Sequence, residues 1–362
     1  MEAFSNWLWK DEFWLPPGVS FKDLQDKPGF YYAKPRDLPM MVVYAIGLFV
    51  LRLLFERVVT KPLAKKLNIR DKTKKPVENE CLEKVYKDKR SPSEDHMRSL
   101  AKALNWSNKK VDNWFRRRRN QDRPKLTKKL AEASWRCFFY LVSFTFGMSF
   151  LVQAPWFWDN LKCWTDYPRQ TLWPSVYYYY MLEGGFYISL LFSIMRDNRR
   201  KDFVEQLIHH TATIFLILFS YVANFVRVGS LVMAIHDISD IILECAKCFV
   251  YAKMQVLADN LFTLFAIVFI VSRIIIYPYV VIHTTWVKSM WLFRPYPGYY
   301  FFNALLMVLQ LLHIFWSAII IKMAVKMAAV GKLEKDDRSD VEEETSDDEE
   351  NDTDNHVLKK ME

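Results

Sequence analysis

Two apolar stretches of this chain carry ionisable side chains that a membrane-spanning helix ordinarily excludes. The first stretch opens with the adjacent residues His209 and His210. Ionisable groups at membrane depth are costly and usually face the interior of a helix bundle, where they serve a function. Imidazoles and carboxylates are groups of acid–base and nucleophilic catalysis, so the pattern predicts chemistry within the membrane. The second stretch holds His236, Asp237, Asp240, Glu244 and Lys247.

The charges of the chain are segregated, although 51% of its 362 residues are hydrophobic. Residues 61–129 hold 23 Lys and Arg against 9 Asp and Glu, a surplus of 14. Residues 334–362 hold 14 acidic against 4 basic residues, a deficit of 10. The asymmetry indicates a basic soluble module, an acidic tail and a hydrophobic remainder. Cys245 and Cys248 have C-x-x-C spacing without a second pair, so we expect them to pack in the helix bundle rather than to bind a metal or do redox chemistry.

The hydrophobic remainder divides into segments long enough to cross a bilayer core of about 30 Å. We predict an all-α, polytopic membrane bundle of about seven spans; six spans, with the fifth segment re-entrant, is the alternative. Basic loops follow the first, third and last segments, which places the N-terminus in the lumen and the C-terminus in the cytosol. The segments are residues 39–59, 136–153, 175–195, 204–225, 229–252, 257–283 and 298–327.

The basic module, residues 67–128, resembles a homeodomain. The run KKVDNWFRRRRNQDRP is similar to a third homeodomain helix, with Val111, Trp114 and Phe115 as core positions. Homeodomains read adenine with an Asn two residues after this Phe, but Arg117 stands there. The substitution disfavours DNA binding and a role as a membrane-tethered transcription factor. A basic face near acidic lipid headgroups, or a docking surface, is the expected role.

The stretch from 199 to 253 resembles the signature of the TLC membrane domain through its R-K-D-F, H-H and H-D-x-S-D elements. Similarity to vertebrate ceramide synthases extends over nearly the whole chain, including FWLPP, WFRRRRNQDRP, YYYYMLE and DDRSD, and it is strongest to the ceramide synthase 4 subgroup. The resemblance implies an endoplasmic reticulum enzyme that transfers a fatty acyl chain from acyl-CoA to sphinganine or sphingosine. It also implies homo- or heterodimers with related synthases. A non-catalytic TLC-domain protein that binds lipid or associates with the translocon is the alternative.

The resemblance implies five parts: residues 1–37, a luminal aromatic segment; 38–60, the first transmembrane helix; 67–128, the insert; 130–332, the TLC catalytic domain; and 333–362, a disordered cytosolic tail.

The implied reaction gives the ionisable residues their roles. Amide formation needs loss of a proton from the amine, and a neutral imidazole can accept a proton or attack the thioester. We assign His209 as nucleophile or general base and His210 as its neighbour in binding or proton handling. Asp237 and Asp240 would orient and charge-balance the site, with His236 beside them. A buried polar network that only holds two helices together is the alternative, and whether an acyl-imidazole forms stays open.

Helical geometry limits which groups can meet. At about 1.5 Å per residue, the two adjacent histidines lie about 8–9 Å below a helix start near residue 204. Asp237, Asp240 and Glu244 fall at i, i+3 and i+7 and therefore share one helical face. Lys247 extends that face and is expected to pair with Glu244.

Cationic residues at the cytosolic mouth suit the phosphates of coenzyme A, namely Arg199, Arg200 and Lys201. Ordinary positive-inside topology explains the same residues equally well. Acyl-CoA is a co-substrate, and no cofactor is implied. The resemblance places the setting of chain length in the loop before the last span, which consists of Trp286, Val287, Lys288, Ser289, Met290, Trp291, Leu292, Phe293, Arg294, Pro295 and Tyr296.

The tail has the low-complexity acidic composition of a disordered segment. Ser339, Thr345 and Ser346 precede acidic residues, a context that suits phosphorylation by an acid-directed kinase. Regulation through this tail and a merely solvated tail are both open.

Overall fold

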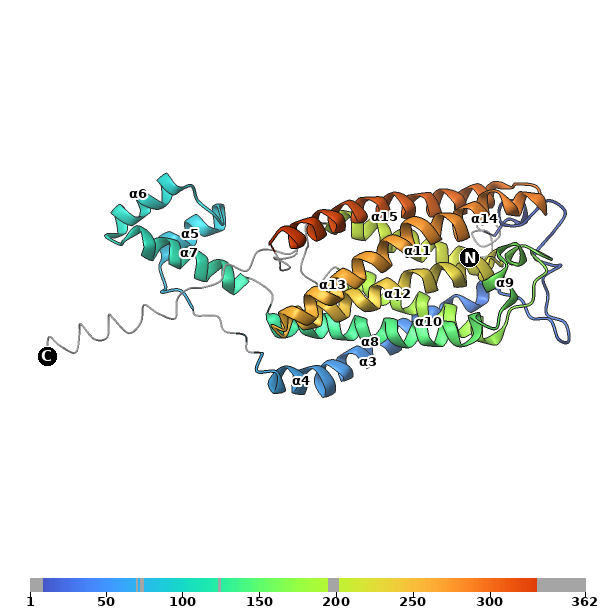
Figure 1. Cartoon of the computed structure of the whole chain (residues 1–362), viewed down its shortest axis with the longest axis horizontal. Helices are drawn as coiled ribbons and strands as arrows, with labels where there is room; N and C mark the ends of the chain where they lie inside the picture. The colour runs from blue at the N-terminus through green and yellow to red at the C-terminus, as the bar shows by residue number, and fades with distance from the viewer. Residues whose placement is uncertain (1–8, 70, 72–74, 123–124, 195–201, 331–362) are drawn as a thin grey trace. The chain divides into compact units, whose positions relative to one another are not determined.

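A computed structural model describes residues 9–69, 71, 75–122, 125–194 and 202–330. These residues form two compact units, one holding the membrane helices and the other spanning residues 71–125. Within the described ranges the secondary structure is helical, apart from one isolated bridge between Lys27 and Phe30. The all-α prediction is therefore confirmed (Figure 1).

The first unit contains seven long helices at the places predicted from the apolar segments. Two of them continue into π-helical turns, η2 (Glu56–Thr60) and η4 (Val271–Ile282), and η4 contains Pro278. Proline removes a backbone donor, which accounts for the departure from regular α geometry in η4. The long helices are α3 (Pro39–Phe55), α8 (Leu126–Leu151), α10 (Pro174–Ile194), α11 (Phe203–Val222), α12 (Val226–Tyr251), α13 (Gln255–Ile270) and α15 (Pro297–Val330).

Four of the described helical stretches are long and apolar enough to cross a membrane: Pro35–Lys66, Phe203–Val222, Gln255–Trp291 and Pro297–Ala329. Their outward faces carry exposed aliphatic side chains, including Ile46, Ile267 and Leu311. Such an exposed apolar surface is expected against lipid rather than water. For α8, α10 and α12 the crossing stays a prediction, although they pack in the same bundle.

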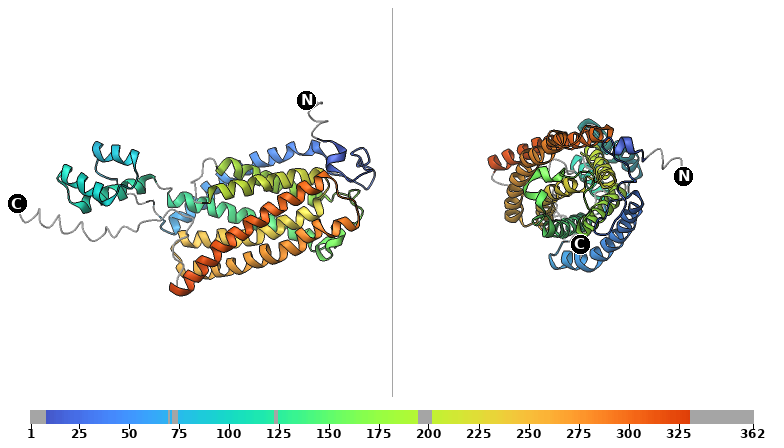
Figure 2. Two further views of the ribbon diagram at one scale, coloured as in Figure 1. Left: turned by 90° about the horizontal axis from the view of Figure 1, so that it is seen from above. Right: turned by 90° about the vertical axis from the view of Figure 1, so that its right-hand side faces the viewer.

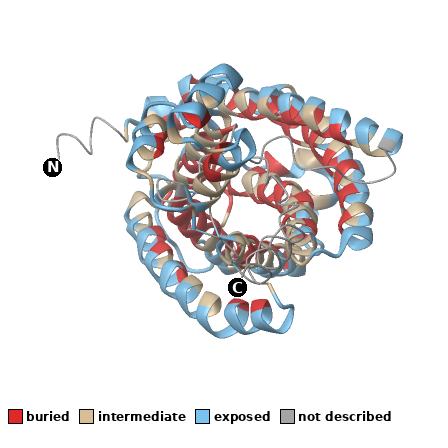
Figure 3. Ribbon diagram, turned by 90° about the vertical axis from the view of Figure 1, so that its left-hand side faces the viewer, coloured by how far each residue is buried: buried red, intermediate tan, exposed pale blue. Residues whose placement is uncertain are grey.

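Helix α12 lies against α8, α13 and η4, while α10 lies against α3 and α11. Figure 2 shows α3 at the outer edge of the bundle, and Figure 3 shows buried positions on the inward sides of the helices. The close approach of α3 depends on Gly185, where an added Cβ would lie 2.6 Å from Cβ of Tyr44 and 2.9 Å from the backbone N of Ala45. Small residues of this kind let membrane helices approach closely.

Short elements close the ends of the bundle. Trp14 of α2 (Asp11–Trp14) stacks on Phe219 with ring centroids 4.6 Å apart. Helix α14 (His283–Trp286) and the 3₁₀ turn η5 (Lys288–Trp291) follow η4 and lead into α15. The remaining short elements are η1 (Pro35–Asp37), α4 (Lys61–Lys66), α9 (Pro155–Trp158) and η3 (Asn160–Cys163).

The second unit is a three-helix domain of α5 (Glu80–Asp88), α6 (Glu94–Leu104) and α7 (Asn108–Asp122). Val111, Trp114 and Phe115 are buried in its core, as the sequence predicted. Ser93 caps α6 by accepting a hydrogen bond from the backbone N of His96 at 3.4 Å. Arg118 of α7 forms a forked pair with Glu83 of α5 at 2.8 and 3.0 Å, which ties the two helices together.

Candidate active site

Four histidines meet inside the first unit, from three helices. His209 of α11, His236 of α12 and His313 of α15 are buried, and His210 is partly buried. The ring of His209 stacks on that of His236 with centroids 6.2 Å apart, and His313 lies 4.9 Å beyond His236. The H-H and H-D-x-S-D elements therefore meet in space, as the sequence predicted.

The hydrogen bonds of these rings distinguish their roles. Nδ1 of His236 lies 2.7 Å from the carbonyl O of Val232, and its Nε2 lies 3.0 Å from Nε2 of His313. Both nitrogens of His236 are therefore engaged. By contrast, Nδ1 of His209 and of His210 is buried without a hydrogen-bond partner among the described residues. The H-H pair therefore carries unengaged imidazole nitrogens, and Nδ1 of His313 is likewise buried without a partner among the described residues.

One side of His209 is covered by Trp316 of α15, whose ring lies edge-on at 5.3 Å. The indole N–H of Trp316 donates to Oδ2 of Asp202, a buried carboxylate at the start of α11, over 3.2 Å. Asp202 is the acidic residue of the R-K-D-F element, so this element holds an aromatic wall against the candidate nucleophile.

The carboxylates of α12 have partners that the sequence left open. Nη2 of Arg273, a buried residue of η4, donates to Oδ1 of Asp240, to Oγ of Ser239 and to the carbonyl O of His236, each at 2.9 Å. Among the described residues, no hydrogen bond joins Asp240 to His209. An orienting effect of Asp240 on that histidine would therefore act through Arg273 and the α12 backbone.

Asp237 is buried and faces Glu183 of α10. Oγ of Ser143 donates to Glu183, whereas both oxygens of Asp237 lack a donor among the described residues. Two carboxyl groups that face each other away from water are known to share one proton, which makes this pair a candidate for proton handling.

The expected pair of Glu244 and Lys247 is confirmed, with Nζ and Oε1 2.7 Å apart. Arg136 of α8 approaches the same carboxylate at 3.6 Å. Glu244 therefore joins α12 to α8 as part of an ion-pair cluster.

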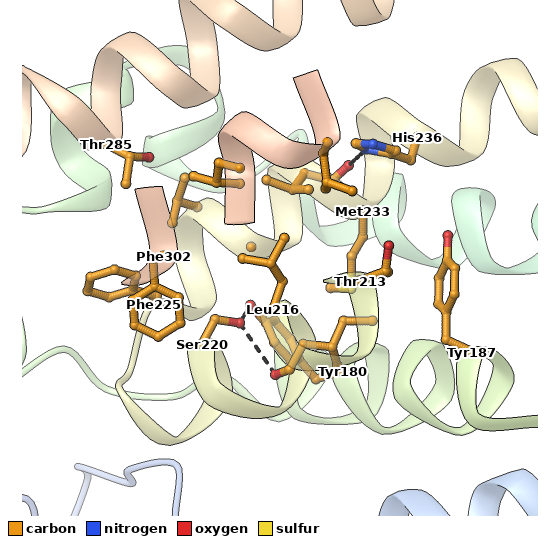
Figure 4. Close-up of a pocket in the computed structure, with 16 residues that line it drawn as sticks. Tyr180, Tyr187, Thr213, Leu216, Ser220, Phe225, Met233, His236, Thr285 and Phe302 are labelled. Atoms are coloured by element: carbon orange, nitrogen blue, oxygen red, sulfur yellow. Dashed lines mark hydrogen bonds between the residues drawn. The ribbon is translucent and has the colours of Figure 1, made fainter. Parts of the chain in front are cut away.

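An apolar cavity of about 50 Å³ has His236 in its wall (Figure 4). His236 and Tyr187 lie at one end of the lining and Phe225 and Phe302 at the other. Thr213, one turn after His209 on α11, is also in the wall. The lining combines aliphatic and aromatic side chains with a few hydroxyl groups, as expected for a site that holds a hydrocarbon chain.

The loop implied to set chain length lies beyond the Phe302 end. Thr285, just before this loop, lines the cavity. Within the loop Ser289 is buried and Trp291 is exposed, and the hydroxyl groups of Tyr296 and Tyr167 lie 2.8 Å apart. The predicted coenzyme A residues Arg199, Arg200 and Lys201 lie outside the described residues, as do Ser339, Thr345 and Ser346 of the tail.

Sequence reasoning missed Glu183, Arg273, His313 and Trp316. Arg273 and His313 lie in apolar segments, so the criterion that selected the H-H pair selects them as well. Trp316 carries no such signal. No group of side chains able to hold a metal occurs in the part of the chain that the structure describes.

Comparison with known proteins agrees with both units. The TLC domain model matches residues 129–322, and the homeodomain model matches residues 70–124. The chain is 46% identical to ceramide synthase 4 of Homo sapiens, over 96% of this chain and 89% of that protein. It is 45% identical to ceramide synthase 5 of Homo sapiens, over 93% and 87%, and 30% identical to ceramide synthase hyl-2 of Caenorhabditis elegans, over 93% and 94%.

The TLC match covers more than half of the chain and contains the whole histidine cluster. The relatives align over both units at up to 46% identity. The chain is therefore a multi-pass membrane protein that belongs to the ceramide synthase family.

Proposed function

We propose that this protein is an acyl-CoA-dependent sphingoid base N-acyltransferase, which makes ceramide or dihydroceramide from sphingosine or sphinganine. The relatives are ceramide synthases by name, and the residues matched by the TLC domain model include the whole histidine cluster. The observation that carries the chemistry is an unengaged Nδ1 on buried His209, whose ring stacks on that of His236 in the wall of an apolar cavity.

The chemistry needs one bond exchange and one proton transfer. The nitrogen of the amine attacks the thioester carbon, the tetrahedral intermediate collapses, and coenzyme A leaves as its thiol. The proton lost from the amine goes to a base, for which His209 is the candidate, and this base then passes the proton to the departing thiolate. In the two-step route His209 attacks first and the amine then displaces it from an acyl-imidazole.

The surrounding groups would support either route. Asp237 with Glu183 supplies a second place for a proton, and Trp316 excludes water from one side of His209. His236 cannot accept a proton while both its nitrogens are engaged. A few carbons of the acyl chain would lie in the cavity between His236 and Phe302, and the chain would extend toward the loop of residues 286–296. This placement supports a role for the loop in chain length.

The charges of the loops and the family resemblance together indicate where the protein resides and how it is oriented. The protein would reside in the endoplasmic reticulum membrane, with its N-terminus luminal and C-terminus cytosolic. Coenzyme A phosphates would bind at Arg199, Arg200 and Lys201 on the cytosolic side. The basic insert would contact acidic headgroups or a docking partner rather than DNA. Dimers with the same or related synthases would follow the family, and phosphorylation of Ser339, Thr345 or Ser346 would modify the tail.

The decisive experiment gives the purified protein sphinganine and a panel of acyl-CoAs and identifies the lipid products by mass. We expect N-acyl sphinganine from the wild type. A loss of about a thousandfold or more in kcat is expected for His209→Ala, as for other essential nucleophiles or bases. A folded, membrane-inserted His209→Ala protein with full activity would refute the assignment. Binding of acyl-CoA by the wild type without any product would instead favour the non-catalytic alternative.

A second measurement separates the two routes. The protein is incubated with acyl-CoA alone, denatured, and its mass determined. An added acyl group that maps to His209 supports the two-step route, and an unmodified mass supports direct attack.

A further inference from the structure

His313 lies on α15, far in sequence from the other ionisable residues of the site, and it is fully buried. Its Nε2 is 3.0 Å from Nε2 of His236, and its ring is edge-on to Tyr277 at 4.9 Å. A buried histidine in an apolar segment is costly, so its place beside the site calls for a function.

The partners of His236 determine where the protons are. The carbonyl O of Val232 only accepts, so the hydrogen bond to it at 2.7 Å requires a proton on Nδ1 of His236. A neutral His236 then has a lone pair on Nε2. The contact with His313 therefore requires a proton on Nε2 of His313, which donates to His236. This tautomer leaves Nδ1 of His313 as the nitrogen without a partner among the described side chains.

Arg273 does not share a hydrogen bond with His313 in this tautomer, because Nη1 of Arg273 and Nε2 of His313 then both carry protons. Its Nη1 is 3.5 Å from Nε2 of His313, at the outer limit of a hydrogen bond, while its Nη2 makes three bonds of 2.9 Å elsewhere. The nearby guanidinium also disfavours a second positive charge on His236. The 3.0 Å contact between the two imidazoles therefore fixes the arrangement.

His209 stacks on the ring of His236, which is the ring that His313 holds in place. We propose that His313 is a positioning residue for acyl transfer, which donates to Nε2 of His236 and so keeps this ring fixed and closed to the reaction proton beside His209. The inference rests on the function proposed above. It explains how two stacked imidazoles can lie together while only one acts as a base.

The test compares two amide side chains of different length at position 313. In His313→Gln the amide nitrogen lies close to the place of Nε2 and can still donate to His236. In His313→Asn the amide is one methylene shorter and cannot reach. We expect His313→Gln to keep kcat within about threefold of wild type, and His313→Asn to lose about tenfold, equivalent to one buried hydrogen bond. KM for acyl-CoA should stay unchanged in both, since His313 does not contact the substrate.

Controls separate this role from packing. His313→Leu keeps an apolar side chain in an apolar helix, so a packing role predicts that it is at least as active as His313→Gln; we expect it to resemble His313→Asn. Gln310→Leu is the matched control, a buried polar residue one turn earlier on α15, and we expect it to retain wild-type kcat. Melting temperatures in detergent identify any variant that fails to fold.

A double variant tests whether His313 acts through His236. In a His236→Phe background, His313→Asn should cause no further loss of kcat, because its partner is gone. Equal activity of the Gln and Asn variants, or full additivity with His236→Phe, would overturn the inference while the wild type still makes product. A wild type that makes no N-acyl sphinganine would instead refute the function proposed above.

Discussion

The pair formed by Asp240 and Arg273 gives the sharpest prediction about how the site is held. Arg273 is 3% exposed and Asp240 is 20% exposed, and their closest atoms are 2.9 Å apart. Arg273 also holds Ser239 and the backbone of His236, so one guanidinium fixes a full turn of α12 against η4. We consider Asp240→Asn, Arg273→Met and the double substitution.

The structure sets the magnitude. At 2.9 Å and an effective dielectric constant of about 20, the attraction between the two charges is about 6 kcal/mol. Desolvation offsets much of it, and removing one partner of a buried pair typically costs about 3–5 kcal/mol. Asn can still accept one hydrogen bond, and Asp240 is partly exposed, so we expect about 2–3 kcal/mol for Asp240→Asn. Arg273→Met removes all three bonds and should cost about 3–5 kcal/mol.

The double substitution should cost less than the sum of the single ones, by about 2 kcal/mol or more, because neither charge is then left alone. Unfolding in mixed micelles of increasing denaturing detergent measures the stability of each variant, and kcat is measured on the same samples. Lys247→Met is the matched control, because Glu244 keeps Arg136 as a second cation at 3.6 Å. Its effect on kcat should be small.

Additive losses of stability would refute the pairing as described. Loss of activity in Asp240→Asn with full activity in Arg273→Met would show that the carboxylate acts directly on a histidine or on substrate. We expect both single variants to lose activity together, because both loosen the segment that carries His236.

Three further predictions concern packing and charge. Gly229→Ala would place a Cβ 1.8 Å from the hydroxyl of Tyr180 in the cavity wall. We therefore expect a changed preference for acyl chain length when acyl-CoAs of different length compete for the enzyme. An unchanged preference would show that this wall does not select the chain. Gly185→Leu should lower the melting temperature in detergent, because α3 cannot stay in place, whereas Gly47→Leu, in open space, should not. In the three-helix unit the hydrogen bond from Arg118 lowers the pKa of Glu83 below its ordinary 4.5. Their pair should therefore stabilise the unit above pH 4.5 and lose this effect as the pH falls through the lowered value, as hydrogen exchange of α5 in wild type and Glu83→Gln would show.

Much of the architecture could be predicted because each helix carries its own signal. The apolar segments identified the seven long helices, and Trp114 and Phe115 identified the core of the three-helix unit. The H-H pair and His236 were selected because ionisable residues stand out in an apolar sequence. The free-energy cost of placing such a side chain in a membrane span does not depend on which helix it faces, so the sequence alone reveals it.

Partners across helices could not be predicted in the same way. The helical face of Asp240 follows from its spacing, but which helix lies against that face does not, so Arg273 was not foreseen. The same holds for Trp316, whose contacts with His209 and Asp202 join α15, the last long helix, to the start of α11. Such pairs depend on bundle packing, for which a single helix carries no local signal.

The different roles of His209 and His236 follow from this packing. A helix can place two imidazoles side by side, but it cannot make one reactive and the other inert. The difference arises from two further elements, α15 and η4. His313 of α15 forms a hydrogen bond with Nε2 of His236, and Arg273 of η4 donates to the backbone carbonyl O of His236. His209 keeps an unengaged nitrogen because no described side chain occupies it. The reactive group is thus specified by what its neighbours bind, and formation of the site requires the whole bundle rather than the signature helices alone.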